Sequence, residues 1–122
     1  MTEFVDMLVD FYATHENLLA ILRHEAVAGR SVAVEVIRDR SLPIIDAVSA
    51  LLEERQRTGE VRADVAPREI ILAVMSMAVY PFAEAGMLEG VLPGCAPRAG
   101  AALEARKRAI VAMLLGGVRA GA

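Results

Sequence analysis

The chain has 122 residues, of which 56% are hydrophobic, and a formal net charge of −3. This length suits one domain with a single core. The densest cationic run, Arg106-Lys107-Arg108, spreads around a predicted helix, and so the chain lacks the basic surface that phosphate binding requires. We therefore do not expect direct contact with nucleic acid. The apolar content comes mainly from Ala, Leu and Val, and this surplus favours an oligomer over a monomer.

Two features indicate a cytoplasmic protein. Cys95 is the single cysteine, so no internal disulfide can form, and we interpret it as an incidental thiol rather than a nucleophile. The start Met1-Thr2-Glu3 does not have the basic and apolar regions of a signal peptide. The most apolar segment, residues 70–83, is shorter than the roughly 20 residues that span a membrane. We expect no membrane contact.

Apolar residues at helical spacing predict a first helix over residues 3–13. Its acidic face, formed by Glu3, Asp6 and Asp10, is interpreted as solvated rather than as a metal site. Thr14 is the expected N-cap of a second helix over residues 15–28, which Gly29 ends. A helix predicted so close to the first residue suggests a fragment of a longer chain.

Residues 30–58 combine two patterns. Val32, Val34 and Val36 alternate as in a strand, but no second strand candidate exists to pair with them. We therefore predict a helix, interrupted or kinked near Pro43, which has no N–H to donate. Gly59 is the expected stop, and residues 59–66 form a connection. Pro67 suits the first turn of the next helix.

The segment over residues 70–83, IILAVMSMAVYPFA, is apolar on nearly every side. Such a helix must be covered on more than one side, by its own core and by a partner, a ligand or both. We expect a kink at Pro81, an end at Gly86 or at Pro93-Gly94, a loop over residues 92–100 and a last helix over residues 101–118. The fold class is therefore all-α, an orthogonal domain of five or six helices.

The last helix is also apolar on every side after Ala109. Two consecutive helices of this kind predict an antiparallel hairpin that packs on a twofold copy of itself, as a four-helix bundle across a homodimer. A monomer that buries the final helix is the alternative. The sequence leaves open which stripe meets the partner. The interface candidates are Val74, Ala78, Ala105, Ala109, Ile110, Met113, Leu114 and Gly117.

Three segments resemble one family. GEVRADVAP at residues 59–67 is similar to the connection before the penultimate helix of TetR/AcrR-type transcriptional regulators, where Gly, Arg and Asp precede a helix that starts near Pro. Tyr80-Pro81-Phe82 occurs in part of that family, and residues 110–117 resemble its terminal helix. Each motif alone has low specificity, whereas their order and spacing are moderately specific.

The resemblance covers only the C-terminal domain of such regulators, which dimerises and binds effectors. Their N-terminal helix-turn-helix has no counterpart in these 122 residues. The resemblance therefore implies either a fragment with an upstream DNA-binding domain or a relative that lost this domain, and the early first helix favours a fragment. The resemblance thus implies the regulatory domain of a TetR-like repressor. A small apolar ligand would enter the helical cavity and alter the spacing of DNA-reading heads that another segment supplies.

The ligand pocket is predicted from side-chain chemistry, because no ligand-specific motif is present. Ser76 and Tyr80 share a helix face and would orient a ligand in an apolar cavity. The alternative is that this face borders solvent or makes an internal hydrogen bond. Apolar candidate walls include methionines, which adapt to irregular shapes, although core packing explains each of them equally well. The pocket candidates are Met7, Phe11, Leu22, Met75, Ser76, Tyr80 and Phe82.

Enzyme chemistry has little support in the sequence. His15 and His24 fall on opposite sides of one helix and are interpreted as surface residues. No nucleophile–base spacing, phosphate-binding glycine loop or paired metal ligands occur. We expect no cofactor, no metal and no enzyme, although a small enzyme with distant acid and base groups stays open. The main alternative is a stand-alone helical dimerisation module without a ligand.

Overall fold

The computed structural model describes residues 2–29, 32–93 and 100–119, which form six α-helices. These are α1 (Thr2–Thr14), α2 (Glu16–Val27), α3 (Val32–Arg57), α4 (Pro67–Ala83), α5 (Ala85–Val91) and α6 (Gly100–Val118). The only β-type pairing in this part of the chain is one antiparallel bridge between Val61 and Arg119. The predicted all-α fold class is confirmed.

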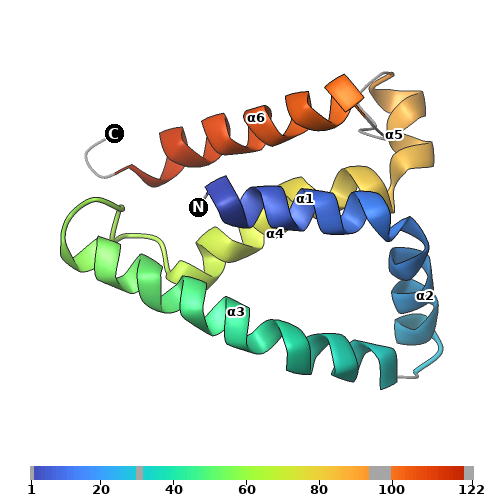
Figure 1. Ribbon diagram of the computed structural model, residues 1–122, viewed down its shortest axis with the longest axis horizontal. Helices are drawn as coiled ribbons and strands as arrows, with labels where there is room; N and C mark the ends of the chain where they lie inside the picture. Colours follow the sequence, from blue (N-terminus) through green and yellow to red (C-terminus); the bar gives the residue numbers. More distant parts are fainter. Residues whose placement is uncertain (1, 30–31, 94–99, 120–122) are drawn as a thin grey trace.

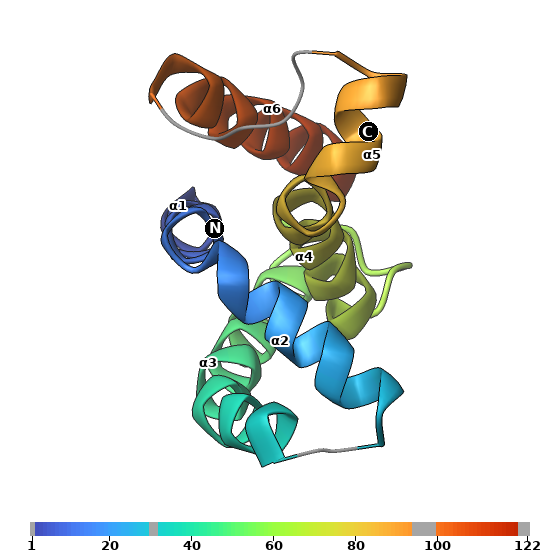
Figure 2. The same cartoon turned by 90° about the vertical axis from the view of Figure 1, so that its right-hand side faces the viewer.

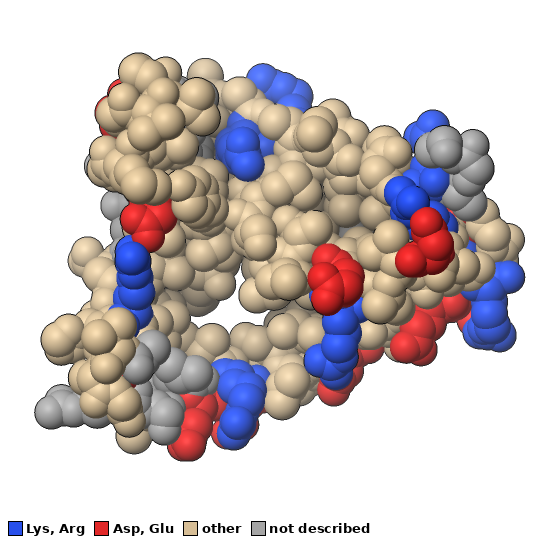
Figure 3. Space-filling view, turned by 180° about the vertical axis from the view of Figure 1, so that it is seen from behind, with Lys and Arg blue, Asp and Glu red and all other residues tan. Residues whose placement is uncertain are grey.

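The helices are layered around α4. α1 and α4 lie side by side, α6 packs across both, and α3 packs on α4 from the opposite side (Figures 1 and 2). α2 bridges the two sides and contacts α1, α3 and α4. Seen from behind in Figure 3, an opening separates α3 from the layer of α1 and α4. The arrangement therefore leaves a gap beside the central helix.

The core lies where α1, α3 and α6 approach α4. Its buried residues come from these four helices, because α1, α3 and α6 each turn an apolar stripe toward α4. They are Val5, Val9, Leu52, Ile70, Ile71, Val74, Ala78, Ile110 and Leu114. The opposite side of α4, which includes Leu72 and Tyr80, stays exposed. The domain alone thus covers only part of its most apolar helix.

The predicted glycine stops are confirmed. Gly29 and Gly59 have φ angles of 76° and 84°, a left-handed conformation that glycine adopts without steric cost. After α3, the Glu60 N–H donates to the Arg55 carbonyl at 3.0 Å and the Gly59 N–H to the Gln56 carbonyl at 3.3 Å. These two bonds form a Schellman motif, which satisfies carbonyls at the helix end.

One expectation about a helix boundary is wrong, and of the interruption or kink predicted near Pro43 the interruption does not occur. Thr14 is not an N-cap: it is the last residue of α1, and its hydroxyl donates to the Asp10 carbonyl at 2.9 Å. α3 passes through Pro43 without interruption. Proline there removes the bond to the carbonyl of Asp39, an exposed residue at which water can replace the lost donor.

Pro81 lies inside α4, which ends at Ala83, before the predicted end at Gly86 or at Pro93-Gly94. The chain changes direction at Glu84, where α4 and α5 meet at 87°. The missing N–H of Pro81 leaves the Met77 carbonyl without its helical donor, and Arg106 Nη2 of α6 donates to that carbonyl at 3.0 Å. A proline inside one helix therefore creates an attachment point for another.

Among the described residues no single helix is both long and apolar enough to cross a membrane, and α4 with α5 reaches that length only across the 87° bend. The residue Cys95 and most of the predicted loop over 92–100 lie outside the described part of the chain.

Candidate functional site

The connection between α3 and α4 holds the end of α6. Arg62 forks onto Asp64, with Nε and Nη2 at 2.6 and 2.7 Å from the two carboxylate oxygens. Arg62 Nη1 also donates to the Gly117 carbonyl at 3.2 Å, and its backbone N–H to the Val118 carbonyl at 2.7 Å. These donors satisfy carbonyls at the C-terminus of α6.

We call the contact of Arg62 and Asp64 with the C-terminus of α6 the clasp, and charge strengthens it. The hydrogen bond from Arg62 lowers the pKa of Asp64, and the same bond raises the pKa of Arg62. On the other side of the connection, Gln56 Nε2 donates to the carbonyls of Arg62 and Val65 at 3.0 and 2.7 Å. The connection thus links the end of α3 and the C-terminus of α6 immediately before the start of α4.

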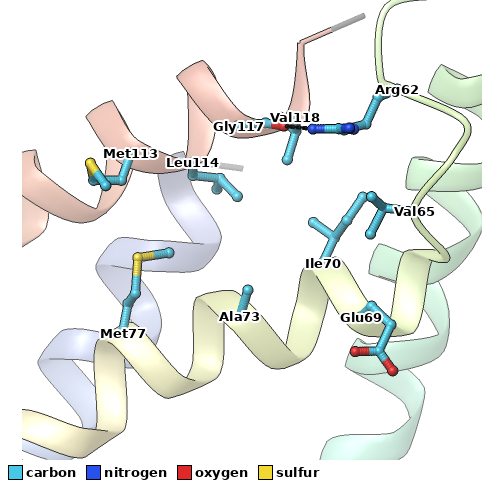
Figure 4. Close-up of a pocket in the computed structure, with 10 residues that line it drawn as sticks. All are labelled: Arg62, Val65, Glu69, Ile70, Ala73, Met77, Met113, Leu114, Gly117 and Val118. Carbon is cyan, nitrogen blue, oxygen red and sulfur yellow. Dashed lines mark hydrogen bonds between the residues drawn. The ribbon is translucent and has the colours of Figure 1, made fainter.

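A hollow of about 180 Å³, which we call the α4–α6 groove, lies between α4 and α6. Figure 4 shows Arg62 at one end, Met77 and Met113 on facing helices at the other, and the Glu69 carboxylate turned away from α6. Its walls are Arg62, Val65, Glu69, Ile70, Ala73, Met77, Met113, Leu114, Gly117 and Val118. The groove is therefore apolar along most of its length.

The groove continues outward as an uncharged strip. Residues three or four apart from Met113 lie on the same side of α6. We call Ala73, Met77, Ala102, Ala105, Ala109, Met113 and Gly116 the outer strip; all are exposed except Met77, which is half-buried. Met113, at 70% exposure, is its most prominent apolar side chain.

The predicted interface residues divide into two groups. Val74, Ala78, Ile110 and Leu114 lie in the chain's own core, with at most 5% exposure. Their side chains are therefore largely covered within this chain. Ala105, Ala109, Met113 and Gly117 are exposed along the groove and the outer strip. The small residues of α6, rather than the bulky stripe, face outward.

A second hollow, the tyrosine pocket, occupies the side of α4 that adjoins the end of α1. It is a shallow depression, largely open to solvent, with a volume of about 420 Å³. Its lining consists of Tyr12, Met75, Ser76, Val79, Tyr80, Ala83 and Glu84. Burial raises the pKa of Tyr12, so that its phenol stays neutral over the physiological range.

The tyrosine pocket brings together three of the predicted pocket residues, Met75, Ser76 and Tyr80. The other candidates are not in its lining. Met7 and Phe11 are exposed on α1, Leu22 is half-buried on α2, and Phe82 packs against the core.

Sequence reasoning missed two polar residues that line the pocket, Tyr12 and Glu84. The signal for Tyr12 was its place beside Phe11 on a predicted helix, and Glu84 is the first charged residue after the apolar segment. Neither signal showed that the two residues line the same pocket.

Outside these hollows the titratable groups have ordinary structural roles. Asp10 of the acidic face pairs with Lys107 of α6 at 2.7 Å, which links α1 to α6 and raises the pKa of Lys107. His15 and His24 are both exposed. Among the described residues, no three His, Cys, Asp or Glu side chains are grouped closely enough to hold a metal ion.

Comparison with known proteins gives one match. A family model described as "Tetracyclin repressor-like, C-terminal domain" matches residues 1–114 of the 122. Searches of the curated proteins and of the solved structures return no match.

Proposed function

Since this chain belongs to the tetracyclin repressor-like C-terminal domain family, we propose that it is the ligand-binding and dimerisation domain of a TetR-like transcriptional repressor. Domains of this family are regulatory rather than enzymatic. In our proposal the chain forms a homodimer, binds a small and largely apolar effector, acts in the cytoplasm and contacts no DNA itself. A separate segment would read the operator.

The outer strip is the observation that carries the dimer. It joins α4 and α6, the two helices expected to form the bundle, and presents small residues that allow close approach of another helix. Arg106 turns inward to the Met77 carbonyl, and this leaves the strip without a charged member. A twofold copy would bury Met113 against the α4–α6 groove of its partner.

The tyrosine pocket supports the effector part of the proposal. It combines apolar walls with the few polar groups that fix a ligand's orientation. A ligand bound there touches α1, α4 and the α4–α5 corner together. An effector that prefers one arrangement of these helices would shift the population toward that arrangement, and with it the spacing of the DNA-reading segments.

The test of the dimer is light scattering coupled to gel filtration, on the wild type and two matched variants. Met113→Lys introduces a charge on the outer strip. Leu115→Lys introduces the same charge at another exposed position of α6, beside Val61 and Leu51 rather than beside α4.

We expect a dimeric wild type, a monomeric Met113→Lys protein at micromolar concentration and a dimeric Leu115→Lys protein, because burying one unpaired charge in each half of the interface is costly. A monomeric wild type, or a Met113→Lys protein that remains a dimer, would contradict the proposed interface.

A further inference from the structure

The polar groups of the tyrosine pocket have a common electrostatic character. Among its lining residues, Glu84 is the one charged group. The Ser76 hydroxyl donates to the Leu72 carbonyl at 2.8 Å, so toward the pocket its oxygen can only accept. Two tyrosine rings add electron-rich faces, which attract cations. Besides the two tyrosine hydroxyls, which can donate as well as accept, the pocket therefore offers one negative charge, an acceptor and π surface.

Glu84 already holds a cation. Arg23 of α2 lies 2.5 Å from Glu84 Oε1, and this ion pair attaches α2 to the corner between α4 and α5. The two partners differ in exposure: the Arg23 side chain is 62% exposed and the Glu84 side chain 29%. Glu84 thus belongs to the pocket lining, whereas Arg23 is the more exposed partner and is not part of that lining.

An exposed ion pair contributes about 0–1 kcal/mol. A ligand cation that also buries apolar surface can therefore replace Arg23. Burial of its apolar body contributes favourably to the free energy of binding, and Arg23 gains no such contribution. The walls that would take this body are Met75, Val79 and Ala83.

We propose, building on the effector-binding function above, that the tyrosine pocket takes an amphipathic organic cation whose charged group displaces Arg23 from Glu84. The aromatic or aliphatic part of the ligand lies against Met75 and Val79, with its charge close to the Tyr80 ring. Displacement of Arg23 releases α2 from the α4–α5 corner, so ligand binding and the position of α2 are coupled.

The experiment is a calorimetric titration of the full chain with tetraphenylphosphonium, a permanent apolar cation, and with tetraphenylborate, an anion of the same shape. We expect the wild type to bind the cation at least about tenfold more tightly than the anion, the factor that corresponds to one charged interaction. Equal binding of both ions would overturn the proposal.

Two variants separate ligand competition from a structural effect, because both break the same ion pair. Glu84→Gln removes the ligand's counter-charge and should weaken binding of the cation about tenfold. Arg23→Gln removes the competitor and should strengthen binding about two- to fivefold. If both variants change affinity in the same direction, the ion pair has only a structural role and the proposal fails.

Circular dichroism checks that each variant is folded. If Glu84→Gln does not fold, the Arg23→Gln variant alone tests the proposal: stronger binding of the cation supports it and weaker or unchanged binding refutes it. Native mass spectrometry then separates the two proposals. A dimer that carries a neutral small molecule but does not bind tetraphenylphosphonium would refute the ligand class and leave the proposed function standing. A chain that binds no small molecule of either kind would refute both.

Discussion

The contact between Arg106 and Pro81 gives a prediction that can be measured by a double-mutant cycle. Arg106 Nη2 donates to the Met77 carbonyl, which Pro81 deprives of its helical donor. Arg106→Met keeps most of the aliphatic stem but removes the donor. A buried carbonyl left unsatisfied costs about 1–3 kcal/mol. Because this bond is only partly buried, the free energy of unfolding should decrease by an amount near the lower end of that range.

The single variant alone is ambiguous. Arg106 Nε is buried and has no hydrogen-bond partner among the described residues, and its removal offsets part of the loss. The Pro81→Ala background resolves this, because alanine at this position supplies the backbone N–H that the Met77 carbonyl lacks. In the Pro81→Ala background, Arg106→Met should lower the free energy of unfolding by at least about 1 kcal/mol less than it does in the wild type. The contribution of Nε is the same in both backgrounds and cancels in the difference between the two values.

The assay is urea unfolding of the wild type, the two single variants and the double variant, followed by circular dichroism at one protein concentration, because dimerisation would make stability concentration-dependent. An Arg106→Met cost that is equal in the wild-type and Pro81→Ala backgrounds would show that the arginine does not compensate for the proline.

Two further predictions concern the core and the clasp. Ile110→Ala removes a side chain that is 1% exposed. It should lower the free energy of unfolding by about 2–5 kcal/mol in urea titration, and a loss below about 1 kcal/mol would place Ile110 outside the core. The second prediction is pH-dependent. Since Arg62 lowers the pKa of Asp64, their pair adds stability above the unfolded-state pKa of about 4. That stability is lost as pH falls through the folded-state value. The melting temperature of Asp64→Asn should therefore lie slightly below that of the wild type at pH 7 and approach it near pH 3; a constant difference would refute this linkage.

Local sequence signals predicted most of the fold. Gly29 and Gly59 end helices because the left-handed conformation belongs to the residue itself, and Pro67 starts α4 for an equally local reason. The interruption considered at Pro43 does not occur, because the cost of proline there depends on whether water reaches one carbonyl. At Pro81 a donor more than twenty residues away, Arg106, replaces the missing bond, and no local signal predicts that contact.

The candidate site was less predictable for a similar reason. α6 has apolar residues on every side, so periodicity could not decide whether Ile110 and Leu114 or the alanines face the core. Packing across α1 and α4 turns the bulky residues inward. Ser76 and Tyr80 were recognisable as polar groups in an apolar helix. The position of Tyr12 and Glu84 in the same pocket depends instead on how α1 ends and where the α4–α5 bend falls.

Native mass spectrometry of the purified chain tests the central claim most directly, because one spectrum reports both assembly and bound ligand. The proposed regulatory domain predicts a dimer, and a dimer with the additional mass of a small molecule wherever the effector is retained through purification or added back. A monomer under conditions in which the protein is folded, with no small molecule bound after exposure to a ligand library, would contradict the account.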